Sequence, residues 1–151
     1  MDFWKADDAV KETADELIEK YRPELQGANI TYIFKEKAGK KGEKLTIATA
    51  KKVSPKDNVA HSFKGKPDID FIIEIGNDAW QELNEDQRKA VLLHELCHCA
   101  FQSKGEDGEA EPTIVPHEVE EFSYVIEHFG CYTHDIQKFV DKAIEAKKSE
   151  K

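Results

Sequence analysis

No stretch of this 151-residue sequence comes close to the roughly 20 consecutive apolar residues that a membrane-spanning helix needs. Met1–Asp8 contains acidic residues in the place where a secretion signal would be basic and then apolar. The sequence also has only three cysteines, Cys97, Cys99 and Cys131, and neither their odd number nor their spacing is typical of a disulfide framework. We therefore expect a cytoplasmic protein with reduced thiols and no membrane partner.

The composition is that of a globular chain with a heavily charged surface. Hydrophobic residues make up 39% of the sequence and charged residues 35%, with a net charge of −9. A chain of this length can bury a core without the help of disulfides. We see no repeat and no domain linker, so we expect one domain over residues 1–151, with a frayed tail at 147–151.

Positive charge is concentrated in one segment, Lys35–Lys66. This segment contains ten Lys and only three acidic residues, Glu36, Glu43 and Asp57, so its net charge is +7 in an otherwise acidic chain. A basic segment of this kind predicts weak binding of nucleic acid or another polyanion. A second interpretation stays open, in which the lysines only keep loops soluble and protect sheet edges.

The pattern of apolar residues predicts an α+β fold. A helical stripe is formed by Val10, Ala14, Leu17, Ile18 and Tyr21. Alternating or apolar runs predict strands over 29–35, 45–50 and 71–75, with a hairpin turn at 37–44 and a polar loop over 51–69. The first two strands are thus expected to form a hairpin.

Three further helices are predicted in the second half of the chain. Asn84 and Gln87 have the spacing of a capping box at the start of a central helix. This helix has apolar residues on more than one side, which predicts burial between two layers. Pro116 or His117 is expected to open the next helix, and Thr133 to cap the last one.

His94, Glu95 and His98 form an H-E-x-x-H motif within the central helix. Residues four apart lie about 40° apart around a helix, so the two imidazoles face the same side and can bind one zinc ion. Glu95 lies beside that face, where it can accept a proton from a water molecule whose pKa zinc lowers to about 7. The motif therefore predicts Zn²⁺ on His94 and His98, with Glu95 as the general base.

A catalytic zinc site needs a third protein ligand and keeps the fourth position open. We predict His117, which follows the motif after a loop long enough to return to it. Glu118 or Glu121 would serve in a gluzincin-type site, and Glu121 is the second choice. Cys97 lies near the metal side of the helix and would make a structural site, although it also fits the role of a small core residue.

Three stretches of the chain resemble the phage metallopeptidase family: Asp70–Ile75 with Trp80, Gln87–Cys99, and Pro116–Phe122 closing near Gly130. The resemblance covers roughly residues 8–132, and more distantly the chain is similar to SprT-like zincins. It implies a minimal zincin-like domain with a helix, a small sheet, an active-site helix and a ligand-bearing helix. We therefore expect a short three-stranded sheet packed on a buried H-E-x-x-H helix, with further helices. It also implies zinc on His94, His98 and His117, with Glu95 as the base.

The preferred interpretation is a zinc-dependent metallopeptidase acting on a protein or peptide substrate. In zincins the strand before the motif helix runs along the cleft, so Phe71–Ile75 is expected to hold an extended substrate by main-chain bonds. Tyr124 or Tyr132 are candidates for stabilising the oxyanion. The alternative is a non-catalytic zinc-containing module that binds nucleic acid through Lys35–Lys66. Glu95 favours catalysis, because a structural zinc ion needs no base beside it.

Overall fold

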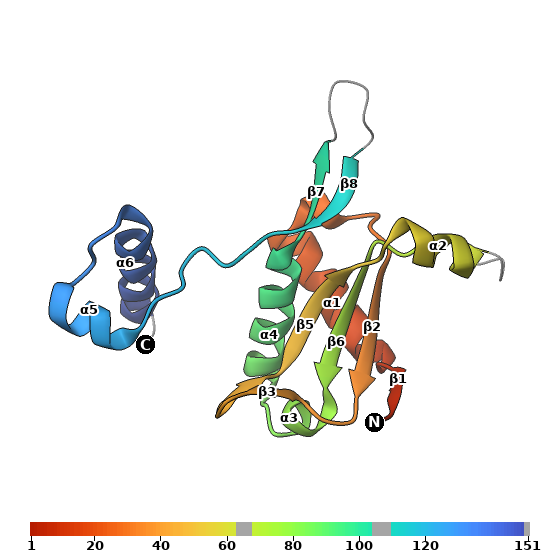
Figure 1. The fold of residues 1–151 in the computed structure, drawn as a ribbon, viewed down its shortest axis with the longest axis horizontal. Helices are drawn as coiled ribbons and strands as arrows, with labels where there is room; N and C mark the ends of the chain where they lie inside the picture. Colours follow the sequence, from red (N-terminus) through yellow and green to blue (C-terminus); the bar gives the residue numbers. More distant parts are fainter. Residues whose placement is uncertain (63–67, 104–109, 150–151) are drawn as a thin grey trace. The chain divides into compact units, whose positions relative to one another are not determined.

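A computed structural model describes residues 1–62, 68–103 and 110–149 of the chain (Figure 1). Lys64 and Lys66 of the basic segment lie outside these described residues. The chain divides into two compact units, Met1–Val115 and Pro116–Lys151, and each is described by itself. The single domain expected from the sequence stays a prediction.

The first unit is built on a four-stranded sheet with the strand order β1-β2-β6-β5. Its strands are β1 (Phe3–Lys5), β2 (Ile30–Lys35), β5 (Ala48–Lys52) and β6 (Phe71–Gly76). β2 and β6 run parallel, and the two outer pairs are antiparallel. Its helices are α1 (Asp8–Tyr21), η1 (Pro23–Leu25), α2 (Pro55–Ser62), α3 (Asn77–Gln81) and α4 (Glu85–His98). Two further two-stranded sheets are formed by β3 (Gly39–Lys41) with β4 (Lys44–Thr46), and by β7 (Cys99–Ser103) with β8 (Ala110–Ile114). The predicted α+β class is confirmed.

The expected three-stranded sheet, with a hairpin of strands 29–35 and 45–50, is wrong. β6 lies between these two strands, because its side chains Phe71, Ile73 and Ile75 are fully buried and such a strand is most stable inside a sheet. β1 adds a fourth strand that the sequence did not indicate. Its three residues are all exposed, so the strand lacks the alternation that would have predicted it.

The lysine-rich turn expected at 37–44 is part of a small hairpin of its own, β3–β4. Gly42 turns this hairpin with a φ of +64°, which glycine adopts without the strain of a side chain. The chain changes partner at Ile47, whose carbonyl accepts a hydrogen bond from the N–H of Gly76 (2.7 Å). The predicted strand 45–50 is therefore divided between two sheets.

Two other predicted segments differ from the structure. The polar loop expected over 51–69 contains helix α2, which begins at Pro55, a residue that the first turn of a helix tolerates. In the second unit, the helix expected from Pro116 or His117 begins only at Ser123; its elements are α5 (Ser123–Phe129) and α6 (His134–Ser149). Within the described ranges, no helix has both the length and the apolar character needed to cross a membrane.

Helices α1 and α4 share one core with the sheet (Figure 1). The predicted stripe of α1 is confirmed for Val10, Ala14, Leu17 and Ile18, whereas Tyr21 is exposed. From α4, Leu92 and Leu96 are fully buried and belong to the same core cluster as residues of α1, β2 and β6. Burial of one such side chain contributes about 1.5–3 kcal/mol, so this core fixes α4 on the sheet.

We predict that Leu92→Ala lowers the free energy of unfolding by about 2–5 kcal/mol, because it leaves a cavity in this core. The matched control is Leu45→Ala on β4, where the leucine is 44% exposed; the expected change is within about 0.5 kcal/mol. Urea unfolding followed by circular dichroism measures both. Similar losses for the two variants would contradict the assigned core.

Candidate metal centre

Helix α4 carries the H-E-x-x-H motif in its last turns and ends at His98. At its start, the Asn84 side chain accepts a hydrogen bond from the N–H of Gln87 (2.8 Å), and the Gln87 side chain accepts one from the N–H of Asn84 (3.0 Å). The predicted capping box is therefore confirmed. It satisfies amide groups that a helix start leaves unpaired, and so it fixes the residue at which the helix begins.

The prediction that α4 is buried between two layers is wrong. Leu92, Glu95 and Leu96 are buried along one stripe, whereas Cys97 is exposed and the His94 side chain is 53% exposed. The role of core thiol considered for Cys97 is wrong for the same reason. The face of the helix that carries His94 and Cys97 is thus accessible from solvent.

Three histidines converge at this face. One donor atom from each of His94, His98 and His117 lies within 4.8 Å of the donor atoms of the other two, and the ring centroids of His94 and His98 are 5.1 Å apart. Among the histidines, cysteines and acidic residues that the structure describes, these three histidines form the group whose donor atoms lie close enough together to share one metal ion. Three such histidines could hold a metal ion.

The tautomer of His98 follows from its contact with Val115. The Nδ1 of His98 lies 2.5 Å from the carbonyl oxygen of Val115, and a carbonyl can only accept, so Nδ1 must carry the proton. The lone pair is then on Nε2. A bond from one ring nitrogen to a backbone carbonyl is the usual way in which a metal-binding histidine is oriented.

The chain returns to α4 through the β7–β8 hairpin. In this hairpin Cys99 pairs with Ile114, and the N–H of Val115 donates a hydrogen bond to the carbonyl of His98 (2.7 Å). His117 follows two residues later in a non-helical segment, so its expected place at a helix start is wrong. The pairing of β7 with β8, rather than a helix, places Val115 beside His98 at the end of the motif.

The alternative ligands have other environments. The Glu121 carboxylate accepts hydrogen bonds from the Tyr132 hydroxyl and from the N–H of Phe122 (2.9 Å), and the Tyr132 bond is the main cause that lowers the pKa of Glu121. Glu118 lies exposed at a bend, and Cys97 is exposed on α4. None of these three belongs to the convergent group.

The two tyrosines considered for the oxyanion have local partners in the second unit. The Tyr132 hydroxyl donates to Glu121, and the Tyr124 ring lies edge-on to the ring of His128, with centroids 4.4 Å apart. Both tyrosines are exposed. These contacts lend no support to a role in stabilising an oxyanion.

Glu95 is a buried acid beside the histidines. The residue is 5% exposed, and its Oε2 lies 3.8 Å from Nε2 of His94. Burial raises the pKa of Glu95 to about 7, while the proximity of His98 and a hydrogen bond from the backbone N–H of Ala50 act in the opposite direction. Glu95 does not belong to the group of three histidines whose donor atoms converge. The site therefore has three imidazole donors with a separate carboxylate beside them.

Sequence reasoning missed two residues that support this site, Ala50 and Arg22. The backbone N–H of Ala50 bonds the Glu95 carboxylate, and the guanidinium of Arg22 donates to the carbonyl of Cys99 (2.8 Å), directly after the motif. Arg22 also pairs with Glu24 (2.6 Å). No local pattern could have indicated either contact, because each joins segments that are distant in the sequence.

The expectation that Phe71–Ile75 holds an extended substrate is wrong, because β6 is paired on one side with β2 and on the other with β5. The edge strand next to α4 is β5. In an antiparallel pair, every second residue directs its N–H and C=O toward the partner strand. Ile47 and Val53 bond to Gly76 and Asp70, at the two ends of β6, so the residues between them in the alternation, Ala48, Ala50 and Lys52, direct these groups away from β6. β8 lies next to part of this edge.

The family model described as "Putative phage metallopeptidase" matches residues 2–144 of the chain. The chain belongs to this family. No curated protein and no solved structure gives a significant match. The resemblance seen in the sequence is therefore confirmed, and in this phage metallopeptidase family member three histidines have the geometry to hold a metal ion.

We predict that His117→Ala weakens zinc affinity by at least about 100-fold, more than the 10–100-fold typical of a lost outer-shell partner. Glu118→Ala, Glu121→Ala and Cys97→Ala are the controls and should change the affinity little. Competition with a chromophoric chelator measures all four. A large loss for Glu121→Ala, with normal binding by His117→Ala, would show that the third ligand is a carboxylate.

Proposed function

We propose that this chain is a zinc-dependent metallopeptidase, in which His94, His98 and His117 hold Zn²⁺ and Glu95 is the general base. The observation that carries the proposal is the convergence of three imidazoles beside a buried carboxylate. Imidazole donors suit zinc, and three of them leave a fourth position open, as catalytic zinc sites require. Membership of a family described as a metallopeptidase supports the same reaction class.

The bound zinc ion would polarise the scissile carbonyl and lower the pKa of a water molecule. The Glu95 carboxylate accepts the proton of the attacking water and then gives it to the nitrogen of the leaving amine. A hydrogen bond from the N–H of Ala50 stabilises the charged form of this carboxylate. His98 stays in the ligating tautomer through its bond to the carbonyl of Val115.

The substrate is a protein or peptide chain that lies extended along β5. This strand is the edge of the sheet, and Ala48 and Lys52 present main-chain groups on the same side as Ala50. Strand addition at such an edge binds a peptide through its backbone and leaves the side chains for selectivity. Because Ala50 also bonds Glu95, a peptide paired with β5 would lie next to the general base.

We predict that Glu95→Gln retains zinc and the fold but lowers peptide hydrolysis by about 100-fold or more, the usual contribution of a general base. The matched control is Asp86→Asn, the same change of charge in the exposed first turn of α4, which should keep full activity. A library of quenched fluorescent peptides measures the rate, and metal analysis measures zinc. Equal hydrolysis by wild type and Glu95→Gln would refute the assigned base.

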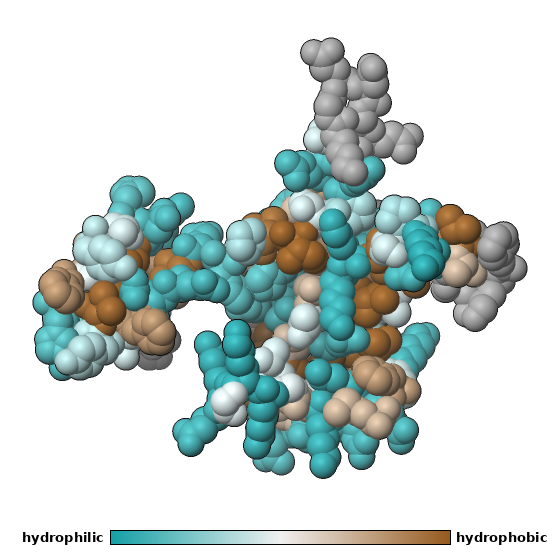
Figure 2. Space-filling model, in the orientation of Figure 1, coloured by the Kyte–Doolittle hydropathy of each residue, from teal (hydrophilic) through white to brown (hydrophobic). Residues whose placement is uncertain are grey.

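The second candidate function is a non-catalytic zinc-containing module that binds nucleic acid. The observation that favours it is the β3–β4 hairpin, where Lys40, Lys41 and Lys44 are exposed and Lys41 pairs directly with Lys44. Hydrophilic side chains project from this hairpin at the lower left of the first unit (Figure 2). Adjacent ammonium groups repel each other, and a polyanion would relieve that repulsion.

For this second candidate, the expected result is DNA binding that weakens steeply with salt and is lost when Lys40, Lys41 and Lys44 are changed together to Gln. Fluorescence anisotropy with single-stranded and duplex DNA at low salt measures the affinity. The control replaces Lys138, Lys142 and Lys147 on α6 with Gln. Absent binding, or equal binding by all three proteins, would leave the hairpin lysines as solubilising surface.

A further inference from the structure

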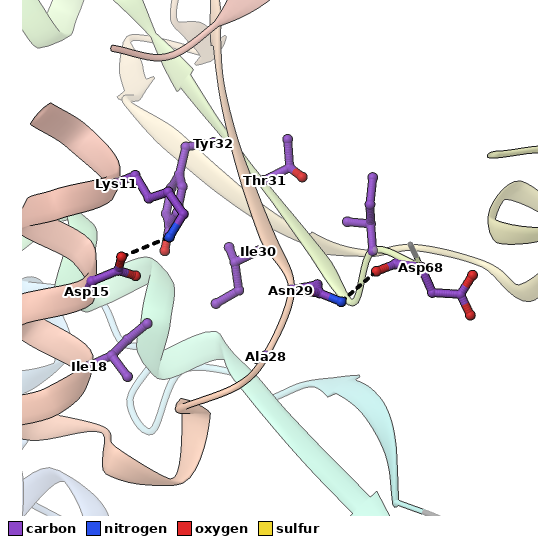
Figure 3. Close-up of a pocket in the computed structure, with 10 residues that line it drawn as sticks. Lys11, Asp15, Ile18, Ala28, Asn29, Ile30, Thr31, Tyr32 and Asp68 are labelled. Carbon is purple, nitrogen blue, oxygen red and sulfur yellow. Dashed lines mark hydrogen bonds and ion pairs between the residues drawn. The ribbon is translucent and has the colours of Figure 1, made fainter. Parts of the chain in front are cut away.

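The first unit contains a pocket of about 400 Å³ between α1 and the first half of β2 (Figure 3). Its volume lies within the range of about 300–1,000 Å³ that is usual for small-ligand sites. The lining residues that matter for its chemistry are Lys11, Asp15, Ile18, Ile30, Tyr32 and Asp68. None of them belongs to the metal centre, so the pocket requires a separate explanation.

One wall of the pocket is the edge of β2 at Ile30–Tyr32, which lies beyond the residues that pair with β1. β1 pairs only with Ile33–Lys35, and the N–H of Ala6 then donates to the carbonyl of Tyr32 (3.0 Å) before the chain enters α1. In this antiparallel pattern every second residue of β2 directs both main-chain groups toward the β1 side. Ile30 is the next such residue and lines the pocket, so its backbone is available to an occupant.

Tyr32 supplies the observation that points to a ligand. The residue is 6% exposed, and its hydroxyl has no hydrogen-bond partner within residues 1–62, 68–103 and 110–149. Figure 3 shows this hydroxyl directed into the pocket next to Lys11 and Asp15. A buried hydroxyl without a partner costs about 1–3 kcal/mol, and folded proteins rarely leave one unsatisfied.

The charges of the lining favour a cationic occupant. Asp15 and Asp68 contribute two carboxylates, whereas Lys11 is the single ammonium group among the lining residues. Lys11 pairs with Asp15 at 2.8 Å, but both side chains are more than half exposed, so the pair is weak and can be displaced. Burial is the largest cause that raises the pKa of Tyr32, followed by the charge of Asp15, so the phenol stays neutral.

We propose that this pocket binds an alkyl ammonium or guanidinium group. Its N–H groups donate to the Tyr32 oxygen and the Asp15 carboxylate, and its aliphatic stem packs against Ile18 and Ile30. The group has two sources, a free aliphatic amine or a Lys or Arg side chain of an extended peptide. A peptide would in addition pair with the exposed main chain of Ile30. This inference is independent of the proposed peptidase activity.

The test is isothermal titration of the full-length, zinc-loaded protein with three probes. These are agmatine, a capped hexapeptide with one central Arg, and the same peptide with norleucine in place of Arg. We expect binding of agmatine, of the Arg peptide, or of both, and no binding of the norleucine peptide. Binding of agmatine identifies the free amine as sufficient, whereas binding of the Arg peptide alone identifies the peptide as the source.

Three variants locate the binding. Asp15→Asn should weaken it about 10-fold or more, because a charge-assisted hydrogen bond is lost. Lys11→Gln should strengthen it, because the competing ammonium is removed. Tyr32→Phe should weaken it and raise the melting temperature of the unliganded protein, since it removes an unsatisfied hydroxyl. Tyr21→Phe, at an exposed tyrosine of α1, is the control and should change neither quantity.

Two kinds of result would overturn the proposal. The first is that neither agmatine nor the Arg peptide binds wild type, or that Asp15→Asn binds as tightly as wild type. The second is that Lys11→Gln weakens binding, which would mean that the occupant is an anion held by Lys11. All four variants change side chains without adding bulk, and circular dichroism shows whether each one is folded.

Discussion

The two hydrogen bonds between His98 and Val115 connect the parts of the candidate centre. One bond runs between the backbones and fixes the segment after β8 against the end of α4. The other fixes the ring of His98 in the tautomer whose Nε2 can bind a metal. The same contact therefore sets the orientation of His98 and holds Val115, the last residue before Pro116, against the end of α4.

The core below the motif allows these bonds to form at fixed positions. Leu92 and Leu96 attach α4 to the sheet, and Glu95 lies between them in sequence with its carboxylate buried. A buried carboxylate is costly unless it is bonded, and β5 offers the N–H of Ala50 at this place. The apolar core thus places this acid on the buried side of the helix, while His94 stays on the exposed side.

Local signals in the sequence predicted much of the fold. The α1 stripe, the Asn84 capping box and the apolar run of β6 each depend on neighbouring residues. The capping box and the β6 run are confirmed, and so is the stripe except for Tyr21, which is exposed. The position of β6 between β2 and β5 depends on contacts between distant segments, and local alternation does not encode them. The sequence also missed the open edge at Ile30, because it arises where β1 ends rather than from any property of Ile30 itself.

The same division applies to the metal centre. The spacing of His94 and His98 on one helix is a local property, whereas the proximity of His117 to them does not follow from spacing within one element. X-ray absorption at the zinc edge of the zinc-loaded protein tests this most directly, because it identifies the ligand atoms themselves. We predict only nitrogen and oxygen ligands at about 2.0–2.1 Å, whereas a sulfur ligand at about 2.3 Å would place Cys97 in the site and contradict the three-histidine assignment.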